Sequence, residues 1–156
     1  MAPDIFAKLG DIKGESLDDK HKDEIEVVSF SWGATNPIAV SSGGSAAGKV
    51  TFKEFSIVHQ IDKASPLLMK ACATGQHLKD ATITQRKAGK GQHDFLIFKM
   101  NDVIITSVTE VSGDPDVETV TLTFAKVAVE YKPQKADGSL DAGIHFKYDI
   151  KTNKEG

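Results

Sequence analysis

Histidine and cysteine are the residue types in this sequence that could bind a metal ion or act as a catalytic base or nucleophile. The histidines are His21, His59, His77, His93 and His145. No two of them have the four-residue separation of a zinc-binding helix, and Cys72 with His77 lacks further ligands at a suitable spacing. No G-x-S-x-G nucleophile motif is present. These patterns predict no metal, no cofactor and no catalytic residue, so we expect a protein that is not an enzyme.

The acidic residues also give no sign of acid–base catalysis. They are frequent in stretches typical of loops and turns, such as residues 10–23 and 112–115. We expect none of them inside an otherwise apolar strand face, where burial would raise the pKa of a carboxyl group. A catalytic site assembled from residues that are distant in the sequence is the remaining route to an enzyme.

A partial phosphate-binding motif occurs in a long Ser-, Gly- and Ala-rich stretch, residues 36–49. Gly43, Gly48 and Lys49 match the start of G-x-x-x-x-G-K, but position 50 is Val where a magnesium-binding Ser or Thr is needed. The residues that follow alternate like a strand, whereas a phosphate loop opens a helix. We therefore expect no nucleotide binding. A loop of this length in a compact domain is uncommon and is typical of a functional segment.

Length and composition limit the classes of function. The chain of 156 residues predicts one domain over residues 1–156, with a net charge of −3 and a single arginine, Arg86. Such a surface does not suit nucleic acid, which needs clustered Lys and Arg. No stretch approaches the roughly 20 apolar residues of a membrane span. The N-terminus has no basic region followed by an apolar run, so we expect synthesis in the cytoplasm without a secretory signal peptide.

One short helix is predicted over residues 64–75. Ser65 is the expected N-cap, Pro66 suits the first helical position, and Gly75 suits the left-handed C-cap. Leu68, Ala71 and Cys72 form one apolar stripe, which a lone short helix must bury against a sheet.

The rest of the chain predicts strands joined by turns. The expected strands are residues 4–9, 24–35, 50–60 (with one bulge), 79–87, 95–111, 118–131 and 144–150. This pattern predicts a mainly β fold: an antiparallel two-sheet barrel or sandwich with one short α-helix packed outside.

Some of these strands carry apolar residues on both faces. Phe95, Ile97 and Val103 are expected on the face opposite Leu96, Phe98 and Met100, and Val127 and Val129 on the face opposite Val120, Leu122 and Phe124. An antiparallel sheet usually has one wet face, so the second apolar face needs a cover. We therefore predict a homo-oligomer with Phe95, Ile97, Val127 and Val129 at the subunit interface.

The second predicted strand has one aromatic and one small polar face. Val28, Phe30 and Trp32 are expected in the core, whereas Ser29 and Ser31 are expected on the opposite face.

Several segments together resemble the haemolysin-coregulated protein (Hcp) family over essentially the whole chain. They are Lys13-Gly14-Glu15-Ser16, Glu24-Ile25-Glu26-Val27, Ser31-Trp32-Gly33, Ala47-Gly48-Lys49-Val50, Ile61-Asp62-Lys63-Ala64-Ser65-Pro66, the helix end from Cys72 to Gly75, Arg86-Lys87-Ala88-Gly89, Phe124-Ala125-Lys126-Val127 and Tyr131-Lys132-Pro133-Gln134-Lys135-Ala136-Asp137-Gly138. Each motif is weak alone, but together, in this order and spacing, they are specific.

The resemblance implies a structural subunit of the bacterial type VI secretion system. Family members form small β-barrels whose homohexameric rings stack into a tube inside a contractile sheath, below a spike protein of the valine-glycine repeat type. The tube is expelled without a signal peptide, and some rings hold and stabilise secreted effectors in the lumen. The resemblance thus implies a ring-forming protein that is cytoplasmic and then secreted.

Carried onto this chain, the resemblance suggests roles for the unexplained features. The loop with Asn36, Ser42, Gly43, Gly44 and Lys49 is expected to contact the neighbouring ring. Ser29 and Ser31 are expected to line the lumen. The alternative is a monomeric β-barrel that binds a small ligand in its interior.

Overall fold

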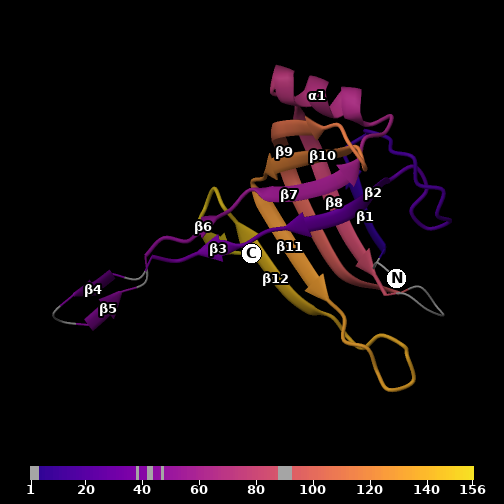
Figure 1. Cartoon of the computed structure of the whole chain (residues 1–156). Helices are drawn as coiled ribbons and strands as arrows, with labels where there is room; N and C mark the ends of the chain where they lie inside the picture. The colour runs from indigo at the N-terminus through magenta and orange to yellow at the C-terminus, as the bar shows by residue number, and fades with distance from the viewer. Residues whose placement is uncertain (1–3, 38, 42–43, 47, 88–92) are drawn as a thin grey trace.

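The computed structural model describes residues 4–37, 39–41, 44–46, 48–87 and 93–156 (Figure 1). Its elements, in chain order, are β1 (Asp4–Leu9), β2 (Ile25–Ser31), β3 (Ala34–Thr35), β4 (Ala39–Ser41), β5 (Gly44–Ala46), β6 (Thr51–Phe52), β7 (Phe55–Gln60), α1 (Ser65–Thr74), β8 (His77–Arg86), β9 (Asp94–Val111), β10 (Val117–Thr123), β11 (Lys126–Tyr131), β12 (Ile144–Asp149) and β13 (Lys154–Glu155). The predicted mainly β fold with one short helix is confirmed.

Six antiparallel strands close a barrel in the order β10-β7-β2-β1-β8-β9. Strand β9 closes the barrel because it is 18 residues long and can pair with different strands along its length. Its first part pairs with β8 on one side and β11 on the other, and its last part pairs with β10. Strands β12 and β13 continue the sheet beyond β11, outside the closed barrel.

The predicted single strand over residues 118–131 is wrong, because the chain changes partners near Phe124 and Ala125. Strand β10 ends at Thr123, and β11 begins at Lys126 on a different part of β9. The break resets the alternation, so Phe124 and Val127 both lie in the core. This segment therefore lacks the predicted second apolar face. Val127 is only 2% exposed, so its side chain cannot contact a neighbouring subunit.

Two further interruptions change which side chains face inward. In β9, Asp102 adopts a positive φ of 58°, and Met100 and Val103 are both buried, so the prediction that Val103 faces outward is wrong. In β2, the register against β7 shifts between Val27 and Ser29. This bulge leaves Val28 57% exposed instead of in the core with Phe30.

Helix α1 packs on β9 through the expected stripe, with Leu68 and Ala71 buried. Gly75 ends it at φ 64°, as predicted. The predicted Ser65 cap is wrong, because Ala64 takes the N-cap position and Ser65 is the first helical residue. The Ser65 hydroxyl instead accepts a hydrogen bond from the Asp62 backbone N–H at 3.1 Å.

Side chains fill the interior of the barrel. The rings of Phe30, Phe55 and Phe98 have centroids 5.2–5.5 Å apart, and Trp32 packs edge-on against Phe98. These contacts tie β2, β7 and β9 together across the core.

The described residues between 34 and 52 form a two-stranded ribbon that projects from the barrel; we call it the arm (Figure 1). Strand β3 pairs with β6 at its base, and β4 pairs with β5 further out. The predicted loop over residues 36–49 is therefore partly regular. The predicted strand over residues 50–60 is two strands, β6 and β7, which are separated by Lys53 and Glu54 rather than by a bulge.

Candidate assembly surfaces

A groove lies at the base of the arm. Its aromatic floor is built by Trp32, which stacks on Phe52 with centroids 5.6 Å apart, and by Phe146 and Tyr148 of β12. The groove has a volume of about 740 Å³, and Asn36, Gly48, Lys49, Asn153 and Glu155 also line it. This part of the molecule therefore combines an apolar hollow with a projecting ribbon.

The sequence-predicted stacking residues are distributed along the arm. Asn36 and Lys49 are exposed at the groove, and Gly44 begins β5. Ser42 and Gly43 lie outside the described residues. At Gly48, a Cβ atom would collide with the Pro37 carbonyl oxygen, so glycine permits the close approach of the two chain segments.

A hydroxyl-rich face covers the outer surface of four neighbouring barrel strands. Cross-strand pairing places Ser31, Ser56, Thr121 and Ser107 in one row across β2, β7, β10 and β9. Ser29, Val58, Thr119 and Thr109 form the next row. The hydroxyl of Thr121 is hydrogen-bonded to those of Thr106 and Ser107, at 2.8 and 2.5 Å.

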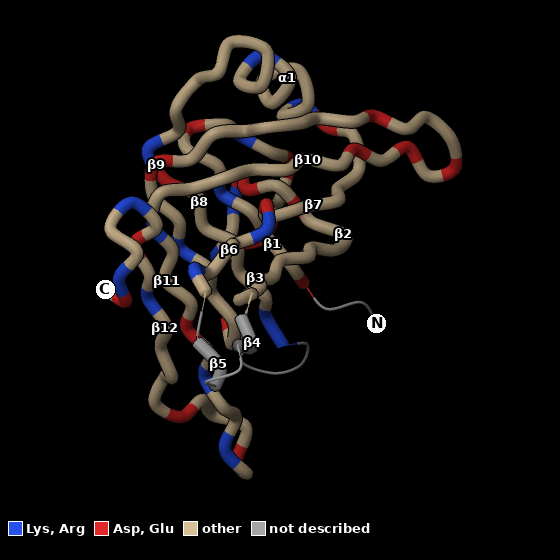
Figure 2. Tube along the Cα trace, turned by 90° about the vertical axis from the view of Figure 1, so that its left-hand side faces the viewer, with Lys and Arg blue, Asp and Glu red and all other residues tan. Residues whose placement is uncertain are grey.

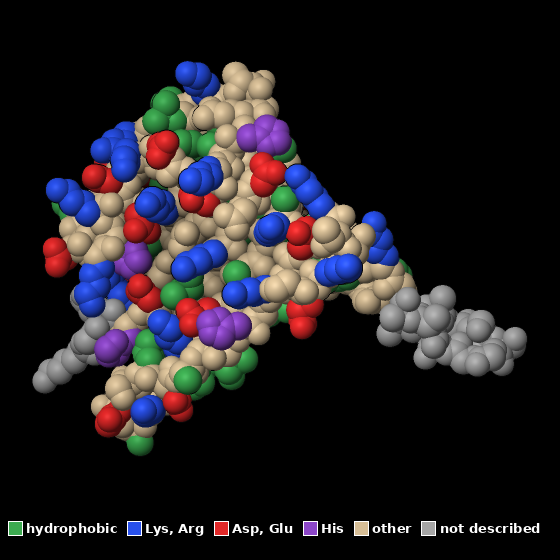
Figure 3. All heavy atoms as spheres, turned by 180° about the vertical axis from the view of Figure 1, so that it is seen from behind, with side chains coloured by type: hydrophobic (Ala, Val, Ile, Leu, Met, Phe, Trp, Pro, Cys, Tyr) green, Lys and Arg blue, Asp and Glu red, His purple; other side chains and the backbone are tan. Residues whose placement is uncertain are grey.

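This face carries few charges. The sequence has no Lys or Arg between Lys99 and Lys126, so the charged residues around the turn between β9 and β10 are all acidic (Figure 2). The back of the molecule differs, because charged side chains of both signs are scattered over it (Figure 3). Ser29 and Ser31 are exposed as predicted from the alternation, and they belong to a broad neutral surface.

An apolar shelf extends from the core along β11 and β12. Tyr131 pairs with Ile144 and Val129 pairs with Phe146, on the side of the sheet that also carries the core residue Val127. Beyond the barrel this side is open, with Ile144 66% and Phe146 38% exposed. The final predicted strand is therefore less buried than its alternation indicated. The shelf is defined here as Tyr131, Ile144 and Phe146.

The four sequence-predicted interface residues do not share one face. Phe98 of β9 pairs with Val129, so Val129 and Val127 point to the core side. Ile97 alternates with Phe98 and is half-buried on the other side of β9, whereas Phe95 lies at a register shift and its ring packs edge-on against that of Tyr131, with centroids 6.0 Å apart. The prediction of one shared interface was wrong for Val127 and Val129 because it treated β10 and β11 as one uninterrupted strand.

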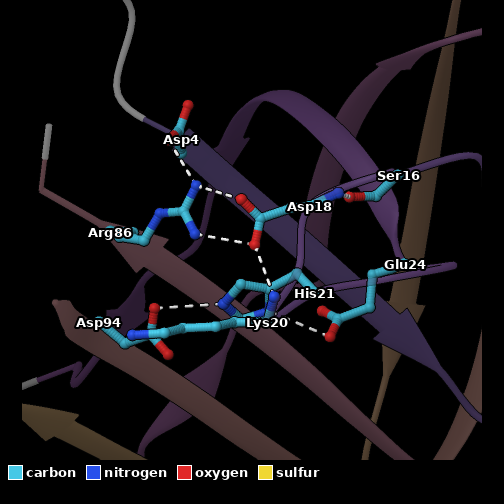
Figure 4. Close-up of polar contacts among 8 residues, drawn as sticks. All are labelled: Asp4, Ser16, Asp18, Lys20, His21, Glu24, Arg86 and Asp94. Atoms are coloured by element: carbon cyan, nitrogen blue, oxygen red, sulfur yellow. Dashed lines mark hydrogen bonds and ion pairs between the residues drawn. The ribbon is translucent and has the colours of Figure 1, made fainter. Parts of the chain in front are cut away.

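A polar cluster holds residues 10–24 against the barrel (Figure 4). We call it the Arg86 cluster; it contains Asp4, Asp18, His21, Glu24, Arg86 and Asp94. The buried guanidinium of Arg86 donates to both carboxylate oxygens of Asp18, at 2.9 and 2.7 Å, and to Asp4 at 2.8 Å. These hydrogen bonds lower the pKa of Asp18 to about 2 and raise that of Arg86.

His21 is the second anchor of this loop. Its ring stacks on Phe6 with centroids 4.3 Å apart. Its Nδ1 lies 3.0 Å from Glu24 and its Nε2 lies 3.2 Å from Asp94. Each ring nitrogen of His21 therefore faces a carboxylate, and these contacts together with the Phe6 stack hold the loop at this point.

The sequence did not reveal a buried acid–base pair, His59 of β7 and Glu118 of β10. Nε2 of His59 lies 2.8 Å from Oε1 of Glu118, and both residues are buried. Burial raises the pKa of Glu118, although the hydrogen bond from His59 opposes this. The expectation that no carboxylate lies within an apolar strand face is therefore wrong. The sequence did contain one indication of a buried Glu118: its two-residue spacing from Val120 and then Leu122 places all three side chains on the same face of a strand.

The described residues contain no group of three or more His, Cys, Asp or Glu side chains that could hold a metal ion. Within the same residues, no helix is long and apolar enough to cross a membrane.

Comparison with known proteins relates this fold to one family. The family model described as "Type VI secretion system effector, Hcp" matches residues 6–131. Protein hcp1 of Pseudomonas aeruginosa is 45% identical over 159 residues, which cover 98% of each chain.

Solved structures agree with that relationship. A type six secretion system protein matches with a TM-score of 0.92 and 31% identity, over 99% of this chain and 100% of its own. Hcp1 from Salmonella typhimurium matches over the full length of both chains, with a TM-score of 0.80 and 36% identity. The cap protein of an anti-feeding prophage tube matches with a TM-score of 0.56 at 14% identity, over 81% of this chain and 87% of its own, which is a likeness of fold alone.

Proposed function

Because the chain belongs to the Hcp family of the type VI secretion system, we propose that it is a structural tube subunit whose copies form hexameric rings that stack and are expelled. The observation that carries this proposal is the apolar shelf, an open continuation of the core. An uncovered apolar face of this kind is typical of a surface that a partner subunit covers.

The ring is the first level of the proposed assembly. We assign one side of the subunit contact to Tyr131 and Ile144, because these side chains are exposed and lie on the core side of β11 and β12. Phe146 lies where the shelf meets the groove at the base of the arm. Phe95 and Ile97 are secondary candidates, since their side chains are only half-buried. Val127 takes no part in the proposed subunit contact, because it belongs to the protomer's own core.

The arm and the hydroxyl-rich face have roles in the assembled tube. The arm, with Asn36, Gly44 and Lys49, is proposed to contact the neighbouring ring. The rows that contain Ser29 and Ser31 are proposed to line the lumen, where short hydroxyl side chains leave room for secreted effectors. A wall without Lys or Arg holds cargo by hydrogen bonds and close packing rather than by salt bridges to acidic groups.

Export follows from the same assignment. In this proposal the subunit is made in the cytoplasm and leaves as part of the expelled tube, with the sheath and a spike protein of the valine-glycine repeat type as further partners. A non-catalytic role fits a family of secreted tube proteins.

Light scattering on the purified protein tests the ring, with a mass of six protomers as the expected result. Ile144→Asp should reduce this mass to that of smaller species, because it places a charge on the shelf, while the protomer stays folded by circular dichroism. Lys147→Asp is the matched control, since Lys147 is exposed on the opposite face of β12. A shelf variant that retains the full ring would overturn the shelf assignment.

The same measurement examines the alternative of a monomeric ligand-binding barrel. Aromatic and aliphatic side chains fill the barrel interior, which argues against a ligand there. A stable monomer at micromolar concentration would favour that alternative.

A further inference from the structure

Leu17 is the most exposed large hydrophobic side chain in the part of the chain that the structure describes, at 89%. It lies in the loop that the Arg86 cluster holds, between Ser16, which is buried, and Asp18, which is bound by Arg86. A single exposed leucine is ordinary on a protein surface. Leu17 differs from such residues because hydrogen bonds hold the backbone on both sides of it.

The backbone on both sides of Leu17 is fixed. The Ser16 N–H donates to the Glu24 carbonyl at 3.0 Å, and the Ser16 carbonyl accepts from the Asp23 N–H at 2.9 Å. On the other side, the Asp18 N–H donates to the Ser16 hydroxyl at 3.2 Å. Since these bonds order the loop before any contact forms, docking through Leu17 loses little conformational entropy.

The loop and the arm lie on opposite sides of the barrel (Figure 1). A contact between two different surfaces at opposite ends of identical subunits is heterologous, and it repeats along a row of copies. Stacking of rings by the arm, which is part of the proposed function, therefore needs a receiving surface at the far end of the barrel. The loop that carries Leu17 lies there.

The two surfaces also match in chemistry. Leu17 is flanked by the exposed carboxylates of Glu15 and Asp19. The groove at the base of the arm has an aromatic floor of Trp32 and Phe52, with room for a leucine side chain. Its rim carries Lys49, which can pair with either flanking carboxylate, and also Glu155.

We propose that residues 15–19, with Leu17 at the tip, dock into the groove at the base of the arm of a second copy of this chain in the next ring. This inference rests on the proposed tube function. The inference adds a surface on the neighbouring subunit that the base of the arm can contact. It also assigns a role to the Arg86 cluster, because the hydrogen bonds from Arg86 to Asp18 hold the loop beside Leu17.

Disulfide trapping tests the contact directly. The native thiol is removed by Cys72→Ala, and Leu17→Cys is combined with Ala34→Cys or with Asn36→Cys, two exposed positions at the groove. Under mild oxidation, either pair should give a non-reducing ladder that extends beyond six protomers, because each copy links to one above and one below. Each single variant should give dimers at most. The matched control pair is Leu17→Cys with Lys99→Cys, which lies on the barrel wall.

A non-covalent test uses Leu17→Asp, with Leu67→Asp on the exposed side of α1 as the control. Leu17→Asp should keep the ring mass and the melting temperature of the unmodified protein, but should raise the concentration needed for stacking by about tenfold, measured by sedimentation velocity. Leu67→Asp should stack normally.

Three outcomes have distinct meanings. A ladder that stops at six protomers would make the Leu17 contact a lateral one and overturn its assignment to stacking. Rings that form and stack normally with Leu17→Asp, while no cysteine pair cross-links, would overturn the contact itself. A failure of the unmodified protein to form rings would count instead against the proposed function.

Discussion

Glu118 and His59 lie side by side inside the barrel, with Oε1 and Nε2 2.8 Å apart and both residues closed off from solvent. They are direct cross-strand partners on β10 and β7. Among the residues that the structure describes, Oε2 of Glu118 and Nδ1 of His59 have no hydrogen-bond partner. Because a buried unpaired polar group is costly, the stability of the core depends on whether Glu118 is protonated.

Glu118→Gln should change how stability depends on pH. The pKa of Glu118 is raised in the folded protein, so its stabilising contribution is complete below the ordinary value of 4.5 and is lost as the pH rises through the folded value. Glutamine cannot titrate. The unmodified protein should therefore lose melting temperature relative to Glu118→Gln as the pH is raised above the ordinary value of 4.5. Glu26→Gln, at an exposed position of β2, is the control, and parallel melting curves for Glu118→Gln and the unmodified protein would contradict this prediction.

Asp18→Asn should weaken the attachment of residues 10–24. The change removes the charge that receives two hydrogen bonds from the buried Arg86, at a cost of about 1 to 3 kcal/mol in the free energy of unfolding. Since the pKa of Asp18 is lowered from 3.8 to about 2, its contribution is present above the ordinary value and disappears as the pH falls through the folded value. Acid titration followed by denaturant unfolding measures both effects.

The neighbouring residue supplies the control for that experiment. Asp19 is exposed and lies in the same loop, so Asp19→Asn should leave the free energy of unfolding nearly unchanged. If Asp18→Asn and Asp19→Asn had equal effects at neutral pH, the Arg86 cluster would not be the feature that holds the loop.

Gly75→Ala should destabilise the protein through backbone strain alone. Gly75 ends α1 at φ 64°, and a Cβ atom there would have nothing within 4 Å. The left-handed conformation should therefore cost about 1 to 2 kcal/mol, visible as a lower melting temperature. Gly113→Ala is the matched control, because Gly113 also has open space around it but no positive φ. An equal effect at both glycines would rule out strain as the cause.

Gly48→Ala should affect the arm and leave the barrel intact. The added Cβ would collide with the Pro37 carbonyl oxygen and lie 3.0 Å from Pro37 Cγ, so the base of the ribbon must open. We expect an unchanged melting temperature and ring mass, with impaired stacking measured by electron microscopy. In Gly33→Ala, the new Cβ would meet only the Lys53 side chain, at 3.7 Å, and stacking should persist. Normal tubes with Gly48→Ala would contradict a role for the arm base.

The sequence predicted elements well where one periodicity continues without interruption. Strand β1 has the predicted bounds, with Ile5, Ala7 and Leu9 all buried. The end of α1 was predictable from Gly75, because the left-handed conformation is a local property of the chain. The family was recognisable from the order and spacing of short motifs, which need no knowledge of the fold.

The sequence failed where the alternation is reset by a change of partner. The bulge at Val28, the positive φ of Asp102 and the break between β10 and β11 each change which side chains face the core. Hydrophobic periodicity cannot show these shifts, because each depends on which strand lies opposite. For this reason Val127 was assigned to an interface, although it belongs to the core.

The candidate surfaces show the same division. The sequence alone determined that Ser29 and Ser31 oppose the aromatic face, since alternation along one strand is local. Only the tertiary structure placed them in rows with Ser56, Thr121 and Ser107, left Ile144 and Phe146 uncovered, and joined Arg86 to Asp18 across 68 positions of sequence. Local conformation follows from neighbouring residues, whereas a surface is made by side chains that only the closure of the barrel brings together.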